Sequence, residues 1–164
     1  MSDSELLKLY ERAIPAEWID YNGHLNVAYY VLAFDQATDA MLDYLGMDSR
    51  YRAAAGCSVF VLETHVNYLQ ELVAGERIRC TTQILDADAK RIHYFHRMVQ
   101  VEQRRLAATT ELILLHVDLG SRRGRPMPDA VQANIDAVLA RHRQLPWPEQ
   151  AGRVIGIRSR RTPG

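Results

Sequence analysis

The feature that most constrains the fold is one long helical stretch followed by four long strand-like stretches. Apolar residues from position 27 to position 45 recur at i, i+3, i+4 and i+7, which predicts an amphipathic helix about 28 Å long. The strand-like stretches cover residues 58–69, 76–87, 91–102 and 106–119. Their short connections indicate antiparallel neighbours. The sequence therefore predicts an α+β domain in which a curved antiparallel sheet wraps around one long central helix.

The segments that flank this unit extend the same domain. Residues 6–18 alternate in polarity up to Pro15, which removes a ladder donor and favours an edge strand. A second amphipathic helix is predicted at about 129–143, after two prolines that break the chain. We interpret residues 1–149 as a single domain and residues 150–164 as an arginine-rich C-terminal tail.

Composition gives no support for nucleic acid or a membrane as a partner. Twenty Lys and Arg residues balance twenty Asp and Glu residues, so the net charge gives no reason to expect nucleic acid or an anionic membrane surface. No apolar run approaches the roughly 18 residues that span a bilayer. Two cysteines and the lack of an apolar N-terminal region favour a reducing compartment. We expect a cytoplasmic protein.

The loop before the long helix carries the strongest signal for chemistry. Asn26 is a good N-cap, and Gly23 marks a turn. Asp20 and His24 can both transfer protons, and they precede a helix start whose free N–H groups favour negative charge. We predict Asp20 and His24 as catalytic residues. The residues predicted to orient the loop or bind an oxyanion are Gly23, Asn26 and Val27.

This loop also carries a family resemblance. Asp20, then Gly23-His24-Leu25-Asn26, then a long helix with an early tyrosine resembles the hotdog-fold acyl-CoA thioesterases of the 4-hydroxybenzoyl-CoA type. The resemblance is closer to the betainyl-CoA thioesterases of carnitine catabolism, and it extends from about Leu9 to about Leu119. The segments that support this second step are residues 15–25, 37–40, 67–69 and 114–119.

The resemblance implies a fold, an activity and an assembly. It implies a hotdog fold and hydrolysis of a small acyl-CoA thioester without a cofactor, in a homodimer or a dimer of dimers. It also implies that the position of Asp20 holds the essential carboxylate. One departure keeps the acyl group open: Asn26-Val27 stands where the betainyl relatives are expected to have Arg-Asp. A plain aromatic or short-chain acyl-CoA therefore remains an alternative substrate.

The strand at 58–69 supplies a second candidate carboxylate. A period of two puts Val59, Val61, Glu63, His65 and Asn67 on one face, and Phe60, Leu62, Thr64, Val66 and Tyr68 on the other. A carboxylate beside an imidazole is rarely buried without partners. We therefore predict that Glu63, with His65 and Asn67, competes with Asp20 for the catalytic role. The resemblance implies that this strand lies near the dimer seam, so that two protomers would share the site.

Further residues are candidates for holding the two ends of the substrate. Aromatic faces attract a trimethylammonium group through cation–π interaction. Five aromatic residues lie in or near the loop, or in the segments that support the resemblance. They are Trp18, Tyr21, Tyr29, Tyr30 and Tyr68. Arginines in the predicted connections are suited to CoA phosphates, namely Arg91, Arg122, Arg123 and Arg125. His93 and His96 have opposite parity on one strand, so no metal site is predicted.

Two other functions are compatible with the same fold. One is a hotdog dehydratase or hydratase, which needs a histidine and a carboxylate placed over the α and β carbons of the acyl chain. The other is a non-catalytic module that binds acyl-CoA. Product identity separates hydrolysis from hydration, and binding without turnover identifies the module.

Overall fold

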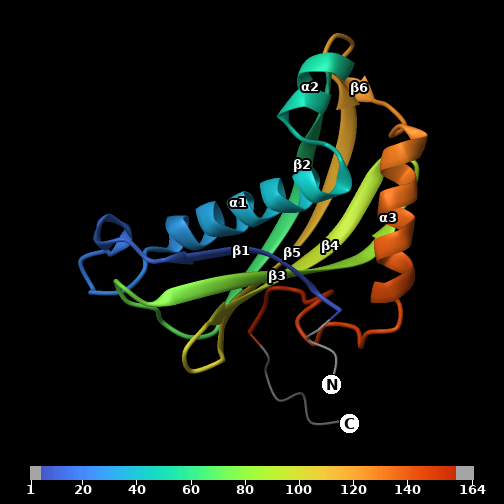
Figure 1. The fold of residues 1–164 in the computed structure, drawn as a ribbon. Helices are drawn as coiled ribbons and strands as arrows, with labels where there is room; N and C mark the ends of the chain where they lie inside the picture. The colour runs from blue at the N-terminus through green and yellow to red at the C-terminus, as the bar shows by residue number, and fades with distance from the viewer. Residues whose placement is uncertain (1–4, 158–164) are drawn as a thin grey trace.

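A computed structural model describes residues 5–157, and its centre is one curved antiparallel sheet. The strands lie in the order β1-β3-β4-β5-β2, and the short β6 pairs with the end of β5 (Figure 1). Their bounds are β1 Leu7–Ala13, β2 Cys57–Tyr68, β3 Arg77–Ala87, β4 Arg91–Gln100, β5 Arg105–Asp118 and β6 Arg123–Gly124. Every pairing is antiparallel, as predicted from the short connections.

The long helix α1 (Val27–Leu45) crosses the inner face of this sheet (Figure 1). The Asn26 side chain accepts a hydrogen bond from the Ala28 N–H at 2.9 Å, and Gly46 ends the helix in the left-handed conformation with φ 93°. The apolar stripe of α1 packs into the core through Ala33, Phe34 and Met41, among others. The expected α+β architecture is confirmed.

Two elements flank the central unit. Helix α3 (Asp129–His142) packs along β3, within the range expected for a C-terminal helix. Helix α2 (Ser49–Ala55) was not predicted, although Asp48 caps it at 2.8 Å and the left-handed Gly56 ends it. None of the helices in residues 5–157 has the length and apolar character needed to cross a membrane. Part of the expected tail, residues 158–164, lies outside the described residues.

Strand β2 contains a bulge that corrects the face assignment made from its sequence. Val61 pairs with Leu114 and Glu63 pairs with the adjacent Ile113, so Leu62 is an extra residue without a partner. Val59 packs against the core and Val61 faces α1, whereas a strict period of two put both on the face of Glu63. Beyond the bulge, Thr64 and Val66 face α1 while Glu63 and His65 point to the outer face of the sheet.

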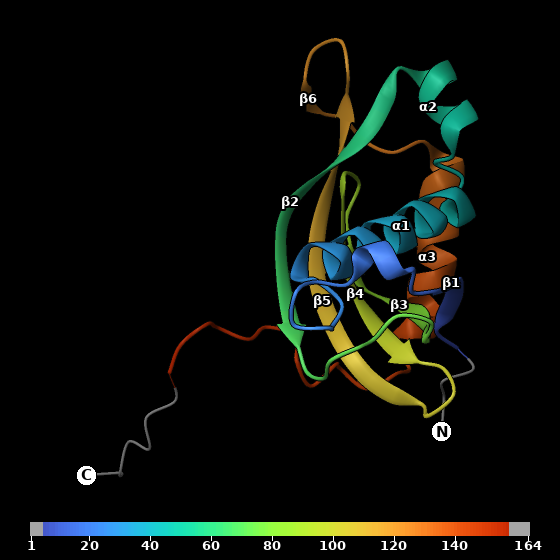
Figure 2. The ribbon, with the colours of Figure 1, turned by 90° about the vertical axis from the view of Figure 1, so that its left-hand side faces the viewer.

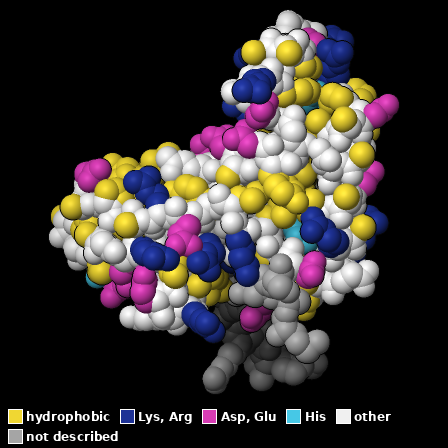
Figure 3. Space-filling view, in the orientation of Figure 1, with side chains coloured by type: hydrophobic (Ala, Val, Ile, Leu, Met, Phe, Trp, Pro, Cys, Tyr) yellow, Lys and Arg dark blue, Asp and Glu magenta, His cyan; other side chains and the backbone are white. Residues whose placement is uncertain are grey.

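The two edges of the sheet have different chemistry. On β1, Glu11 accepts a hydrogen bond from Arg79 at 2.7 Å and pairs with Arg77, and Figure 3 shows acidic and basic side chains interspersed on this side of the molecule. Such charges protect an edge from pairing with another strand. On β2, the central residues are exposed and include Val61 and Leu62. Figure 2 shows β2 forming the opposite border of the sheet.

Candidate active site

The loop before α1 is a compact turn that fixes the position of the Asp20 carboxylate. The Asn22 N–H donates to Asp20 Oδ1 at 2.8 Å, and the Gly23 N–H donates to the Asp20 carbonyl at 3.0 Å. Gly23 has φ 81°, a conformation that favours glycine. The second carboxylate oxygen, Oδ2, has no hydrogen-bond partner among the described residues. The turn therefore holds one oxygen and leaves the other available.

The loop is anchored to the body of the protein at several points. Ile19 and Leu25 form an isolated antiparallel bridge, and the Leu25 N–H donates to the Leu72 carbonyl at 2.7 Å. Trp18 is only 6% exposed, because the Arg12 guanidinium lies 4.1 Å from its ring centroid and Tyr29 stacks on it at 5.1 Å. The catalytic candidates thus stand on a rigid support, as a preorganised site requires.

His24 pairs with a carboxylate that sequence reasoning did not find. Its Nε2 lies 3.1 Å from Glu71 Oε2; the His24 side chain is 40% exposed and the Glu71 side chain 69%. Glu71 lies in the connection that follows β2, which the Leu25–Leu72 hydrogen bond brings beside the loop. No local pattern around Glu71 marks it, since the pairing arises only from the tertiary fold.

The five predicted aromatic residues separate into different environments. Trp18 and Tyr29 stack on each other, while Tyr30 meets the edge of Tyr68 at 5.2 Å. Tyr30 is buried and its hydroxyl donates to the Gln70 carbonyl at 3.2 Å, and burial raises the pKa of Tyr30 to about 12. Tyr21 is 97% exposed and Tyr68 is half exposed. Among the five, Tyr21 and Tyr68 therefore present the most open aromatic surface.

A groove of about 190 Å³ lies between α1 and β2. Apolar side chains form most of its walls, and one carboxylate, Asp35, adds negative charge. Its lining residues are Val31, Phe34, Asp35, Val61, Thr64, Val66, Thr110 and Leu112. One helical turn further on, a second cavity of about 250 Å³ includes Asp39, whose pKa is raised by burial and by the charge of Asp35.

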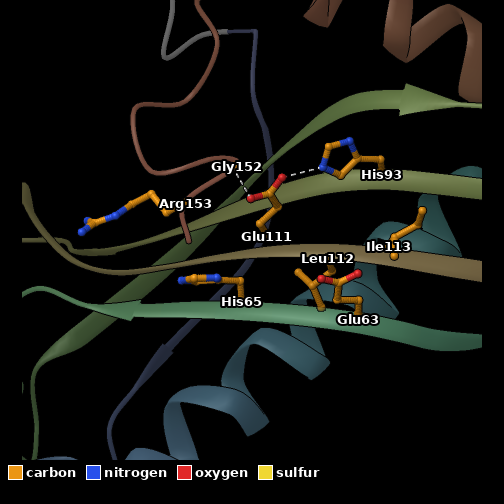
Figure 4. Close-up of a pocket in the computed structure, with 8 residues that line it drawn as sticks. All are labelled: Glu63, His65, His93, Glu111, Leu112, Ile113, Gly152 and Arg153. Carbon is orange, nitrogen blue, oxygen red and sulfur yellow. Dashed lines mark hydrogen bonds and ion pairs between the residues drawn. The ribbon is translucent and has the colours of Figure 1, made fainter. Parts of the chain in front are cut away.

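The outer face of the sheet carries a separate cluster of ionisable groups. Glu63 and His65 on β2 line a cavity of about 360 Å³ together with His93 and Glu111 (Figure 4). Glu111 binds His93 Nε2 through Oε1 at 2.8 Å and accepts the Gly152 N–H through Oε2 at 2.6 Å. Glu63, the second predicted catalytic carboxylate, thus faces away from α1 and its groove.

The predicted phosphate-binding arginines gather at one end of the sheet. Arg122, Arg123 and Arg125 lie on or beside the hairpin that joins β5 to β6, and the turn that contains Arg91 lies beside it. The Met127 N–H donates to the Ala89 carbonyl at 2.8 Å, which ties the two segments together. Arg91 already pairs with Asp88. In Figure 1 this end of the sheet lies at the top, whereas the loop before α1 lies at the left, near the opposite end of β2.

A curved antiparallel sheet wrapped around one long helix is the architecture of the hotdog fold. Residues 14–135 match the family model described as the thioesterase-like superfamily. The chain belongs to this superfamily and is a hotdog thioesterase. The predicted family and fold are confirmed.

Individual relatives support the same conclusion. The chain is 44% identical over 154 residues to the betainyl-CoA thioesterase of Pseudomonas aeruginosa, covering 94% of this chain and 97% of that protein. A Staphylococcus aureus structure in complex with CoA superposes with a TM-score of 0.88 at 29% identity, covering 93% of this chain and 96% of the other. A candidate thioesterase from Pseudomonas putida gives a TM-score of 0.82 at 34% identity, covering 94% and 98%.

Proposed function

We propose that this protein hydrolyses betainyl-CoA to betaine and CoA, with Asp20 as the general base. The observation that carries the proposal is the placement of Asp20 at the start of a helix whose next turns line an apolar groove with an acidic wall. Asp20 removes a proton from water as the water oxygen attacks the thioester carbon. The tetrahedral intermediate then collapses and its C–S bond breaks. The CoA thiolate takes up a proton, and betaine is released as the free acid.

The start of α1 supplies groups for the negative charge that develops on the carbonyl oxygen. The Ala28 N–H donates a hydrogen bond to the Asn26 side chain, whereas the Val27 N–H has no hydrogen-bond partner among the described residues. A well-placed backbone donor of this kind contributes about 3–4 kcal/mol to transition-state stabilisation. Gly23 and Asn26 maintain the turn, and His24 is placed to donate a proton to the leaving thiolate.

The groove between α1 and β2 suits the acyl end of this substrate. Its apolar walls accept methyl groups, and Asp35 favours a fixed positive charge next to them. A quaternary ammonium cannot donate a hydrogen bond, so a nearby carboxylate and an aromatic face such as Tyr68 are the appropriate partners. This supports a small cationic acyl group over a neutral aromatic or straight-chain one.

The first test compares betainyl-CoA with 3,3-dimethylbutanoyl-CoA, which has the same shape and no charge. We expect thiol release with kcat/KM at least about tenfold higher for betainyl-CoA, since a partly desolvated charge interaction contributes a kcal/mol or more. Asp35→Asn should bring the two values together, and Asp43→Asn, on the same helix but outside the groove, should preserve the preference. A wild type that releases no thiol from any acyl-CoA contradicts the proposed function.

We also propose that two protomers pair through the apolar edge of β2. Antiparallel pairing of β2 with its copy places the Cys57 end of one strand beside the Tyr68 end of the other. The Tyr68 end lies near the Asp20 loop, and the Cys57 end lies near the β5–β6 hairpin. The arginines of each hairpin are therefore brought toward the Asp20 loop of the other protomer, where the CoA phosphates of a bound substrate require positive charge.

This arrangement predicts how the hairpin arginines act. Arg122→Ala combined with Arg123→Ala should raise KM for the acyl-CoA about tenfold or more and leave kcat nearly unchanged, because phosphate contacts contribute equally to ground and transition states. The corresponding N-acetylcysteamine thioester lacks the phosphates and should show no change. Arg50→Ala combined with Arg141→Ala, two exposed arginines on α2 and α3, serves as a control of equal charge change. An unchanged KM for acyl-CoA contradicts the assignment.

A further inference from the structure

The segment that follows residue 151 leaves the body of the protein instead of covering it. Val154, Ile155 and Ile157 are 91%, 88% and 100% exposed, which is unusual for three large apolar side chains within four residues. Figure 2 shows this segment running outward past β2 at the border of the sheet. We call residues 153–157 the arm.

The arm has a fixed starting point. The Gly152 N–H donates to Glu111 Oε2 at 2.6 Å, and the Ala151 N–H donates to the Pro148 carbonyl at 3.0 Å. Trp147, in the segment just before, lies 6.1 Å from the His93 ring on the same outer face. The exposed apolar residues thus follow directly after a well-anchored chain.

The outer face of the sheet beside β2 carries acidic and apolar side chains that complement those of the arm. Glu63 has no hydrogen-bond or ion-pair partner among the described residues, although it lines the 360 Å³ cavity where the arm begins. Phe60 and Leu62, which precede it on β2, are exposed apolar residues. The arm combines apolar residues with Arg153, and the sequence continues with further arginines. An acidic and apolar surface therefore lies beside an apolar and basic arm.

The distances decide which copy of that surface the arm reaches. The arm starts over β5, and β2 is the next and outermost strand. Neighbouring strands are about 4.8 Å apart, so the β2 of a protomer paired through this edge lies about 10 Å from the starting point. Five extended residues span about 16 Å. The arm thus crosses its own β2 and places Ile155 over the β2 of the second copy.

We propose that residues 153–157 form an exchanged arm, which docks on the outer face of a second copy of this chain over Leu62 and Glu63. The arm of each protomer crosses the shared β2 edge, so that Val154, Ile155 and Ile157 cover exposed apolar surface of the second copy. Arg153, one residue after the Gly152 anchor, stays at the cavity of its own protomer that contains Glu63. This inference rests on the β2 pairing of the proposed dimer, and it assigns a role to the outer cavity that hydrolysis does not use.

Cross-linking between two differently tagged copies tests the exchange. One copy carries Ile155→Cys and the other Leu62→Cys, and complexes that retain both tags are treated with a short bismaleimide. The native Cys57 and Cys80 are buried, so the wild type provides the background. We expect covalent heterodimers at least about fivefold above a control pair in which Tyr44→Cys, exposed on α1, replaces Leu62→Cys.

A second cross-linking experiment distinguishes an arm that crosses to the other protomer from an arm that folds back on its own chain. Both cysteines are placed in one chain, which is assembled with an excess of wild type. An exchanged arm predicts little cross-linking within that chain, whereas strong cross-linking within it overturns the proposal. A heterodimer yield equal to the Tyr44→Cys control, or a monomeric protein, also overturns it. Thiol release by the same preparations reports separately on hydrolysis.

Discussion

Asp20→Asn is expected to lower kcat for thioester hydrolysis by about a hundredfold or more, the scale for loss of a general base. The amide cannot accept the proton of the attacking water at neutral pH. It does retain a side-chain oxygen that can accept the Asn22 N–H bond now made by Asp20 Oδ1 at 2.8 Å. Loss of activity should therefore occur without loss of the turn. Steady-state thiol release at saturating betainyl-CoA measures the effect.

Two further variants show whether the loss of activity is specific to Asp20. Asp48→Asn makes the same chemical change at a carboxylate that also accepts a backbone N–H, 2.8 Å from Tyr51 N at the start of α2, and it should keep wild-type kcat. Glu63→Gln tests the other predicted carboxylate, on the outer face of the sheet. If Asp20→Asn keeps full activity while Glu63→Gln loses it, the proposed base is wrong and hydrolysis must be assigned to the outer face.

The parts of the fold that could be predicted are those encoded by local patterns. The period of 3.6 residues, the cap at Asn26 and the stop at Gly46 define α1 within the sequence itself. Alternation and short connections likewise gave the strands β2 to β5. The predicted ends of these strands differed from the observed ones by one or two residues, and α2 was missed although Asp48 and Gly56 mark both of its ends.

The parts that could not be predicted depend on tertiary structure. The β2 bulge at Leu62 reverses the facing of every residue after it, and no glycine or proline marks the position. A strict alternation therefore placed Val61 with Glu63, which the structure separates onto opposite faces. The pairing of His24 with Glu71 and the packing of Trp18 between Arg12 and Tyr29 likewise require the folded chain.

A buried polar network between α1 and the sheet makes the stability of this protein sensitive to acid. His96 is fully buried, with Thr82 Oγ1 2.8 Å from its Nδ1 and Thr38 Oγ1 3.0 Å from its Nε2. Tyr94 Oη lies 3.1 Å from the same Thr38 oxygen. These partners are neutral hydroxyls, so nothing in the network compensates a charged imidazole. Burial accordingly lowers the pKa of His96 to about 3.

The sign of the pH effect follows from proton binding in the two states. In the unfolded chain His96 has an ordinary pKa near 6.5, so below that pH the unfolded state takes up a proton that the folded state excludes. Stability is therefore greatest above pH 6.5 and falls as the pH drops toward 3. His142 acts in the same direction, since burial lowers its pKa and its Nδ1 accepts the Ile84 N–H at 2.8 Å.

Urea unfolding at pH 7 and pH 5 should show this loss directly. We expect the free energy of unfolding to fall by about 2 kcal/mol for His96 alone over this interval, where few carboxylates titrate. His96→Gln should remove that part of the difference, even if the variant is less stable at both pH values. Met98→Ala, two residues along β4, creates a cavity and should lower stability equally at both, leaving the difference intact. A wild type equally stable at pH 7 and pH 5 contradicts a neutral, buried His96.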